Sequence, residues 1–231
     1  METQTKLYSI LRRMTKTEIL KYSRLMCEHG HPMISHPACL SKAVHFEERV
    51  GYLDIETSNF NAAFGIVVSW CIKEDGGRIY EGVLSKADFE DKQGYYDKRI
   101  IQSCIDTMRG FDRIVVYWGT NKRFDIPFLR TRAAMMGVDF PFFQELIVND
   151  LYDIVKNKFK FGRNSLAAAC LGLGISAKET PIYPELWVKS IVGRDKKAIA
   201  HILQHNREDV ISTEKLWHRI MNFANTPKSS I

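Results

Sequence analysis

The sequence lacks any apolar run that approaches the length of a membrane-spanning helix, so we expect no transmembrane segment and no membrane partner. Its first residues, METQTKLYSILRRM, contain no hydrophobic core of a signal peptide, which argues against secretion. Cysteine is scarce: there are five, an odd number, and Cys71, Cys104 and Cys170 lie in apolar stretches typical of a protein core. These features argue against a disulfide-stabilised fold and favour a reducing, cytoplasmic location.

The chain also lacks internal repeats, low-complexity segments and a strong charge of either sign. Its 231 residues include 33 Lys and Arg against 27 Asp and Glu, a formal net charge of +6 with a pI near 9.0. This mildly basic balance is compatible with a nucleic-acid partner and equally with an ordinary soluble surface. The hydrophobic content of 45% is that of an ordinary globular protein. The length of 231 residues is enough for one α/β domain and a small appendage.

A change of composition near residue 46 divides the chain into a basic N-terminal extension (1–46), a main domain (47–224) and a short tail (225–231). In the extension, apolar residues recur with helical spacing between Leu7 and Leu25, and Thr15 with Glu18 has the form of a capping box that could restart a helix. The extension carries seven Lys and Arg against three Glu. This surplus could guide nucleic acid to the main domain or bind a partner protein.

Two cysteines and three histidines crowd between positions 27 and 39. Cys27, His31, His36 and Cys39 follow the pattern C-x3-H-x4-H-x2-C and could close a tetrahedral zinc site, with His29 beside them. The spacing matches no common zinc finger, and a loop that carries these residues by coincidence is the alternative. A structural Zn²⁺ here would hold the basic helix against the main domain.

From Val50 onward the pattern becomes that of β-strands and then alternates between helix and strand. Three runs rich in β-branched and aromatic residues, 50–55, 65–73 and 78–84, predict an antiparallel meander. Helices are then expected over 98–108, 124–136, 164–171, 184–191 and 195–223. Two strands, over 113–118 and 146–151, are expected to alternate with the first of these helices. This order predicts an α/β fold, with a mixed β-sheet flanked by helices.

Acidic residues stand at three places in these elements. Asp54 and Glu56, in YLDIET, share one face of the first strand because side chains two residues apart point the same way. Asp125 opens the helix after the fourth strand, and Asp209 follows His205 by four residues in the last helix. Two carboxylates on an apolar strand are costly unless a cation compensates them. Singly, however, Asp125 is a favourable helix start and Asp209 a solvated surface acid.

Together, the blocks DIET, Y-W-G-x-x-x-x-F-D-x-P-F-L and H-N-x-E-D-V resemble the three motifs of the DEDD superfamily of 3′→5′ exonucleases, the proofreading type with a ribonuclease H-like fold. NDLYDIV followed by NSLAAACLGLGI resembles the stretch between the second and third motifs. The resemblance covers residues 48–222. It implies a ribonuclease H-like mixed β-sheet with a small helical N-terminal extension, and it implies that Asp54, Glu56, Asp125 and Asp209 are metal ligands.

The resemblance further implies that two divalent ions roughly 4 Å apart hydrolyse phosphodiester bonds, one activating water and the other stabilising the leaving 3′ oxygen. Carboxylate ligands suit Mg²⁺ or Mn²⁺. By this analogy Asp54 bridges both ions, Glu56 and Asp209 complete the first site, and Asp125 acts at the second ion through water.

The position that orients or deprotonates the attacking water departs from the family's pattern. One branch has Tyr four residues before the last Asp and the other has His five residues before it, whereas this chain has His205 at the first spacing and Gln204 at the second. Helical geometry places His205 beside Asp209, and an ordinary imidazole pKa of about 6.5 suits a general base. A surface histidine that pairs with Asp209, or shares a face with His201, is the alternative.

Aromatic and basic residues near the acids are candidates for nucleic-acid contact. Trp118, next to a glycine turn, is the first candidate to stack on a terminal base, and Phe124 flanks the second motif. Lys158, Lys160 and Arg163, in KNKFKFGR, alternate with aromatic residues as in a groove that follows a nucleic-acid strand. Core packing of the aromatics and a solvated basic loop are the alternatives.

We therefore predict a metal-dependent 3′→5′ exonuclease that acts on single-stranded DNA or RNA, with a polymerase or other replication or repair protein as a candidate partner. The 3′→5′ polarity comes from the resemblance alone. A structure-selective endonuclease or resolvase on the same fold is the alternative, and a non-catalytic nucleic-acid-binding module is the least favoured. A wedge that binds a free end beside Asp54 would favour the exonuclease, and an open basic channel the endonuclease.

Overall fold

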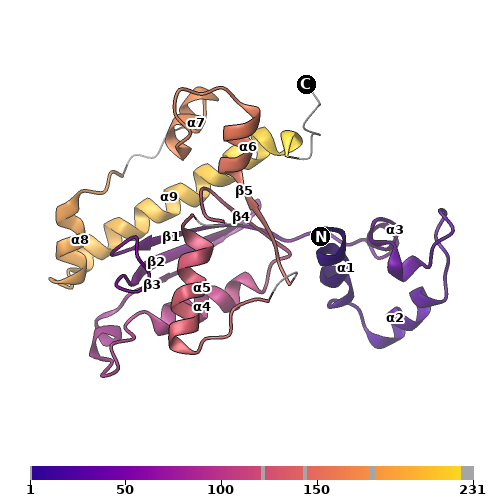
Figure 1. Cartoon of the computed structure of the whole chain (residues 1–231), viewed down its shortest axis with the longest axis horizontal. Helices are drawn as coiled ribbons and strands as arrows, with labels where there is room; N and C mark the ends of the chain where they lie inside the picture. The colour runs from indigo at the N-terminus through magenta and orange to yellow at the C-terminus, as the bar shows by residue number, and fades with distance from the viewer. Residues whose placement is uncertain (1, 121–122, 143–144, 177–179, 225–231) are drawn as a thin grey trace.

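The computed structural model describes residues 2–120, 123–142, 145–176 and 180–224, which form a central sheet with helices on both faces (Figure 1). The five-stranded sheet has the order β3-β2-β1-β4-β5. Its strands are β1 (Val50–Thr57), β2 (Val67–Glu74), β3 (Ile79–Val83), β4 (Arg113–Val116) and β5 (Ile147–Asp150). The first three strands pair antiparallel, whereas β4 and β5 run parallel to β1. The predicted mixed sheet and its meander are therefore confirmed.

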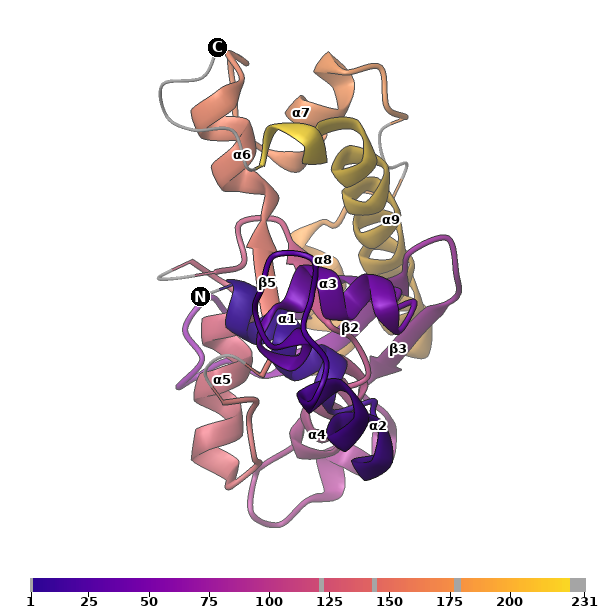
Figure 2. The same cartoon turned by 90° about the vertical axis from the view of Figure 1, so that its right-hand side faces the viewer.

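The helices fall into an N-terminal group and two groups that cover the sheet. They are α1 (Glu2–Leu11), α2 (Lys16–Ser23), α3 (Pro37–Ala43), α4 (Lys98–Met108), α5 (Asp125–Met136), α6 (Leu151–Lys158), α7 (Leu166–Gly172), α8 (Pro184–Ile191) and α9 (Lys196–Ile220), with short 3₁₀ turns at Met33–Ser35, Lys86–Glu90 and Met221–Phe223. The helices α4 and α5 cover one face of the sheet, and α9 crosses the other face along β1 and β2 (Figures 1 and 2).

The strand β1 separates the two halves of the hydrophobic core. Leu53 and Ile55 pack in the half that lies against α4 and α5, whereas Tyr52 packs in the half that lies against α9. Because side chains alternate along a strand, Asp54 and Glu56 share the face of Tyr52 and point towards α9. The sequence alternation therefore directs both carboxylates to the helix that carries the third motif.

The long helix α9 starts at a capping residue and presents a buried stripe to the sheet. The Asp195 carboxylate accepts hydrogen bonds from the backbone N–H groups of Lys197 and Ala198, at 2.7 and 3.4 Å. The stripe is mostly apolar, but His205 and Asn206 lie within it and are also buried. A buried polar pair on an apolar stripe requires partners, and those partners come from β1.

The N-terminal helices α1–α3 lie to one side of the sheet, where an ion-pair cluster holds α1 (Figures 1 and 2). Arg12 Nη2 lies 3.0 Å from Asp112 Oδ1, Arg13 contacts the other carboxylate oxygen, and the Asp112 side chain is fully buried. At the start of α2, the Thr15 side chain accepts from the Glu18 N–H, and the Glu18 carboxylate accepts from the Thr15 N–H at 2.8 Å. The predicted capping box is therefore confirmed.

Two helices differ from the sequence prediction, and each begins where a side chain or proline fixes its first turn. The strand predicted over 146–151 ends at Asp150, whose carboxylate accepts from the Tyr152 N–H at 3.0 Å and so starts α6. Pro37 starts α3 inside the segment read as a loop. The predicted tail, 225–231, lies outside the described residues. Within the described ranges, every helix is too short or too polar to cross a membrane.

Candidate metal centre

One end of β1 and the middle of α9 bring a histidine between two carboxylates. His205 Nε2 lies 3.6 Å from Glu56 Oε1 and 3.5 Å from Asp209 Oδ2. The three side chains are largely buried, with 16% of Glu56, 11% of His205 and 13% of Asp209 exposed. Their ligand atoms all lie within 4.8 Å of one another, close enough to hold one metal ion. Asp209, with 13% of its side chain exposed, is therefore not a solvated surface acid.

A carbonyl group fixes the orientation of the His205 ring. The Thr180 carbonyl oxygen contacts His205 Nδ1, and because a carbonyl can only accept, Nδ1 is the donor. In the neutral imidazole, Nε2 then carries the lone pair, on the side of the ring that faces the carboxylates. The Thr180 segment is itself held on α9, because Glu208 accepts from the Thr180 N–H at 3.1 Å and from its hydroxyl at 2.5 Å. The arrangement therefore presents a base or a metal-ligand nitrogen.

Asn206 holds the first acid of the set. Its Nδ2 donates to Asp54 Oδ2 at 2.7 Å, and its side chain is completely buried. Asp54 and Asp209 line the same pocket, which has a volume of about 260 Å³ and runs between α7 and α9. The residues of the first and third motifs, far apart in the sequence, therefore meet at one place.

Asp125 joins the set from the start of α5. Its Oδ1 accepts a hydrogen bond at 3.2 Å from the backbone N–H of Ile55, the residue between Asp54 and Glu56 in the sequence. Only 3% of Asp125 is exposed. Gly119 makes room for this carboxylate: a Cβ at that position would lie 2.3 Å from Asp125 Oδ2 and 2.7 Å from Val116 Cβ. The glycine of the second motif is therefore required by close packing against the acid.

Burial raises the pKa of the Asp125 carboxyl to about 7, although hydrogen bonds from the backbone N–H groups of Ile55 and of Asp125 itself lower it in part. The nearby carboxylates of Asp150 and Asp209 add smaller upward contributions. A carboxyl placed where it resists ionisation is suited to a cation that would stabilise its charged form. All the candidate ligands in this set offer oxygen or imidazole nitrogen, which suit a hard or borderline divalent ion. The residues present therefore fit the metal chemistry that the sequence predicts.

The raised pKa of Asp125 leads to a stability prediction for the metal-free protein. Because the folded-state pKa exceeds the unfolded value, the neutral carboxyl stabilises the fold at low pH, and that contribution disappears as the pH rises through about 7. In EDTA at pH 8, Asp125→Asn is expected to raise the Tm by at least about 2 °C and to leave it nearly unchanged at pH 4. The control is Asp106→Asn, which alters a side chain that is 58% exposed. A fall in Tm for Asp125→Asn at pH 8 would contradict this account.

A carboxylate at the end of β5 contacts three residues that precede Asp125. Asp150 accepts from the backbone N–H groups of Trp118 and Thr120, at 2.8 and 3.0 Å, and lies 2.6 Å from Arg123 Nη1. Trp118 has a positive φ of 61°, a conformation that these contacts hold in place. Its side chain, 44% exposed, is available to solvent but does not line either pocket beside the acids.

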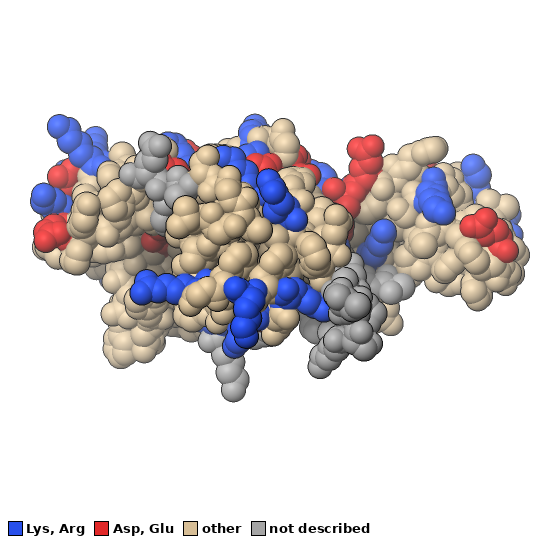
Figure 3. All heavy atoms as spheres, turned by 90° about the horizontal axis from the view of Figure 1, so that it is seen from above, with Lys and Arg blue, Asp and Glu red and all other residues tan. Residues whose placement is uncertain are grey.

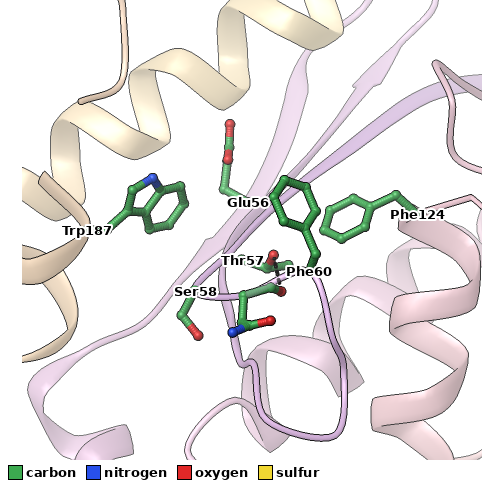
Figure 4. A pocket seen from close by; sticks show the side chains of 7 residues that line it. Glu56, Thr57, Ser58, Phe60, Phe124 and Trp187 are labelled. Atoms are coloured by element: carbon green, nitrogen blue, oxygen red, sulfur yellow. Dashed lines mark hydrogen bonds between the residues drawn. The ribbon is translucent and has the colours of Figure 1, made fainter. Parts of the chain in front are cut away.

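An aromatic pocket of about 350 Å³ opens beside Glu56 (Figure 4). Phe60 and Phe124 meet edge to face on one side, with ring centroids 5.4 Å apart, and Trp187 of α8 stands on the other side. Phe60 is 83% exposed, which is unusual for a phenylalanine with a structural role. The structure therefore places Phe124 in a pocket beside Glu56, with Phe60 and Trp187 as further wall residues. Contact between Phe124 and nucleic acid stays a prediction.

The basic loop after α6 runs beside the pocket that contains Asp54. Tyr117, which lines this pocket, donates to the carbonyl of Asn164 at 2.5 Å, and Ser165 and Leu166 form part of the same wall. Arg163 and Lys160 in this loop are exposed, and Lys158 is partly buried. Basic side chains gather in the middle of the face that carries α6, α7 and α9, seen from above in Figure 3.

Several residues of the centre escape sequence reasoning, and one gives a detectable signal. Asn206 is a polar residue at a position that helical spacing places on the buried stripe of α9, and such a residue indicates a polar partner. Trp187 and Thr180 give no such signal, because their partners on β1 and α9 are fixed only by the tertiary fold.

The structure brings the Cys and His residues of the extension together, but one of the four candidate ligands differs from the sequence prediction. The ligand atoms of Cys27, His29, His36 and Cys39 lie within 4.8 Å of one another, so His29 stands where the sequence pattern favours His31. The reason is a tight turn: Gly30 has φ of 75°, and the Cys27 N–H donates to the His31 carbonyl at 2.9 Å. Burial raises the pKa of the Cys27 thiol, but hydrogen bonds from the backbone N–H groups of His29 and His31 and from the side chains of His29 and His36 together outweigh it and bring the pKa to about 6.

Comparisons with known proteins agree with this architecture. A family model described as RNase_H superfamily matches residues 51–221, most of the chain. A family B DNA polymerase from the hyperthermophilic archaeon Pyrobaculum calidifontis has a similar structure, with a TM-score of 0.61 and 22% sequence identity. The match covers 76% of this chain and only 25% of the polymerase, so the chain spans a quarter of that protein. No curated protein sequence matches the chain.

Proposed function

The chain belongs to the RNase_H superfamily, and we propose on this premise that it is a metal-dependent 3′→5′ exonuclease that hydrolyses single-stranded nucleic acid. The observation that carries the proposal is the convergence of Asp54 and Glu56 from β1 with His205 and Asp209 from α9, completed by Asp125 from α5. A binding module would gain nothing from several carboxylates held together in a largely buried site.

In this proposal each residue has a distinct task. Asp54, Glu56, Asp125 and Asp209 would hold two divalent ions, Mg²⁺ or Mn²⁺, which supply activation of water and stabilisation of the leaving oxygen when bound. His205 Nε2, oriented by the Thr180 carbonyl, accepts a proton from the attacking water or positions it. Asn206 keeps the Asp54 carboxylate in place through its 2.7 Å hydrogen bond.

The aromatic pocket beside Glu56 supports cleavage at an end of the chain. Phe60, Phe124 and Trp187 offer apolar faces on which a terminal base could stack, and the pocket of about 350 Å³ is compact. On the other side of the acids, the basic loop around Arg163 could contact the phosphates that precede the scissile bond. DNA is the first substrate to test because the structural relative is a DNA polymerase.

The test is degradation of a 5′-labelled single strand, as DNA and as RNA, in Mg²⁺, in Mn²⁺ and in EDTA. We expect a ladder of products that shortens from the 3′ end, requires a divalent ion and stops when EDTA is added. The preferred sugar is read from the two substrates in the same experiment.

Two further outcomes would overturn the proposal. Discrete internal cuts, and equal cleavage of a circular strand that offers no end, would identify an endonuclease on the same fold. Binding without cleavage in every metal would identify a nucleic-acid-binding module.

A further inference from the structure

We propose that Cys27, His29, His36 and Cys39 bind one structural zinc ion, at a site separate from the acidic centre. Two thiolates and two imidazoles form a ligand set typical of structural zinc sites, whereas the acidic centre offers mainly carboxylates. The site lies in the N-terminal segment, outside the residues 51–221 that the family model matches.

The four sulfur–nitrogen distances in the cluster are close to those of a tetrahedral zinc site. Cys27 Sγ lies 3.9 Å from His29 Nδ1 and 3.4 Å from His36 Nδ1, while Cys39 Sγ lies 3.3 Å and 3.1 Å from the same two nitrogens. With Zn–S bonds of about 2.3 Å and Zn–N bonds of about 2.05 Å, a tetrahedral sulfur–nitrogen edge is roughly 3.6 Å. The four measured edges fall on both sides of this value.

The backbone holds both halves of the set in position. The turn that carries Cys27 and His29 is closed by the Gly30 N–H, which donates to the Cys27 carbonyl at 2.9 Å. On the other side, His36 is the residue that precedes α3, and Cys39 lies in the first turn of that helix. Residues three apart in a helical turn face the same way, so His36 and Cys39 can bind one ion. The arrangement joins a turn to a helix start through four side chains.

The segment that carries these residues has almost no hydrophobic core. Between residues 15 and 36, Cys27 alone is buried, and α2 contributes no buried residue. Three large apolar side chains remain exposed there: Leu20 is 58%, Leu25 is 42% and Met26 is 61% exposed. A segment that buries so little apolar surface cannot offset the entropy of its ordered chain by packing, whereas metal binding stabilises such small units directly.

A zinc ion here would order the segment that supports α1. Leu40 of α3 is fully buried, α3 packs against α1, and α1 in turn reaches the buried Asp112 through Arg12 and Arg13. Removal of the ion is therefore expected to loosen residues 15–45 and to leave the sheet folded. The position of His31, whose side chain is exposed and outside the set of ligand atoms, makes it the matched control for His29.

The experiment is measurement of bound zinc by elemental analysis on untagged protein, after exhaustive dialysis in a thiol-free reductant. We expect about one zinc per chain in the wild type, in His31→Ala and in Asp54→Ala, and less than about a tenth of this in His29→Ala and Cys39→Ser. Loss of zinc in Asp54→Ala with retention in Cys39→Ser would place the ion at the acidic centre and overturn the proposal. So would loss in His31→Ala with retention in His29→Ala.

Cobalt substitution of the wild-type protein keeps the test decisive even where a variant fails to fold. Co²⁺ in this site should give the visible bands of tetrahedral cobalt together with thiolate charge-transfer absorption, and zinc should abolish both. A thiol-blocking mercurial should release the zinc of the wild type. Metal-free protein in which Cys27 and Cys39 are joined by a disulfide, shown by peptide mapping, would contradict the proposal whether or not the nuclease is active.

Discussion

Asp54→Asn is expected to lower the rate of phosphodiester hydrolysis at least about a thousandfold while the protein stays folded. The substitution keeps the size of the side chain but removes the negative charge with which Asp54 would hold a metal ion in the proposed function. Metal ions contribute several kcal/mol to such reactions, and a loss of about 4 kcal/mol corresponds to three orders of magnitude in rate. Single-turnover degradation in saturating Mg²⁺ measures the loss directly, and circular dichroism shows whether the fold is kept.

Asp75→Asn provides the matched control for Asp54→Asn. Asp75, Glu214 and His218 form a second cluster of potential ligand atoms, more exposed and on another part of α9 and the β2–β3 turn. There His218 Nε2 lies 2.6 Å from Asp75, and Lys73 Nζ lies 3.0 Å from Glu214, so both carboxylates of this cluster already have a partner. We expect Asp75→Asn to keep more than about half of the rate. A similar loss in both variants, or more than a tenth of the activity remaining in Asp54→Asn, would place the reaction elsewhere.

The strand that carries the first motif is predictable because its pattern is local. The alternation that buries Leu53 and Ile55 on one side directs Asp54 and Glu56 to the other, and the structure has this arrangement. The convergence of Asp125 and Asp209 with these acids is not a local property. No periodicity joins residues that lie some seventy or more positions apart, as Ile55 and Asp125 do, and only the resemblance of the three motifs to a known family indicated it.

For the Cys/His cluster, the sequence indicated the kind of site but not which histidine belongs to it. The residue types indicated a metal site, but the spacing could not decide between His29 and His31, which are both exposed and differ by two positions. The choice depends on Gly30, whose positive φ turns the chain so that His29 Nδ1 comes within 3.3 Å of Cys39 Sγ. Similarly, α3 and α6 were missed because short helices are set by their first residues more than by apolar periodicity.

One residue of the aromatic pocket, Trp187, was missed for a different reason. Trp187 lies in a helix whose apolar spacing suggests ordinary packing, and its neighbour in the pocket is Glu56, on a strand far away in the sequence. Phe60, in the same pocket, is 83% exposed. A side chain of this kind signals function through its exposure, which only the fold reveals.

His205→Ala is expected to lower the rate constant of the chemical step about 10²–10⁴-fold, the range over which general bases contribute. The reason is that Nε2, directed by the Thr180 carbonyl, lies between Glu56 and Asp209, where an attacking water would be held. Substrate binding should change much less than the rate. The measurement is single-turnover cleavage as a function of pH, in which the acidic limb of the wild-type profile should be lost in the variant.

A second histidine on the same helix, His201, provides a control that distinguishes a catalytic role of His205 from mere anchoring of the segment at Thr180 and Pro181. His201 Nε2 donates to the Pro181 carbonyl at 2.9 Å, one residue beyond the contact that His205 makes, and it lies one helical turn earlier. If His205 acted only by anchoring this segment, His201→Ala should cost a similar amount. We expect the cleavage rate of His201→Ala to stay within a few-fold of the wild-type rate, with an unchanged pH profile.

His205→Tyr introduces the residue found at this spacing in one branch of the family that the motifs resemble. It should recover part of the cleavage rate because a tyrosine hydroxyl can also position water. Full activity in His205→Ala, with its acidic limb intact, would transfer the role of the base to one of the carboxylates.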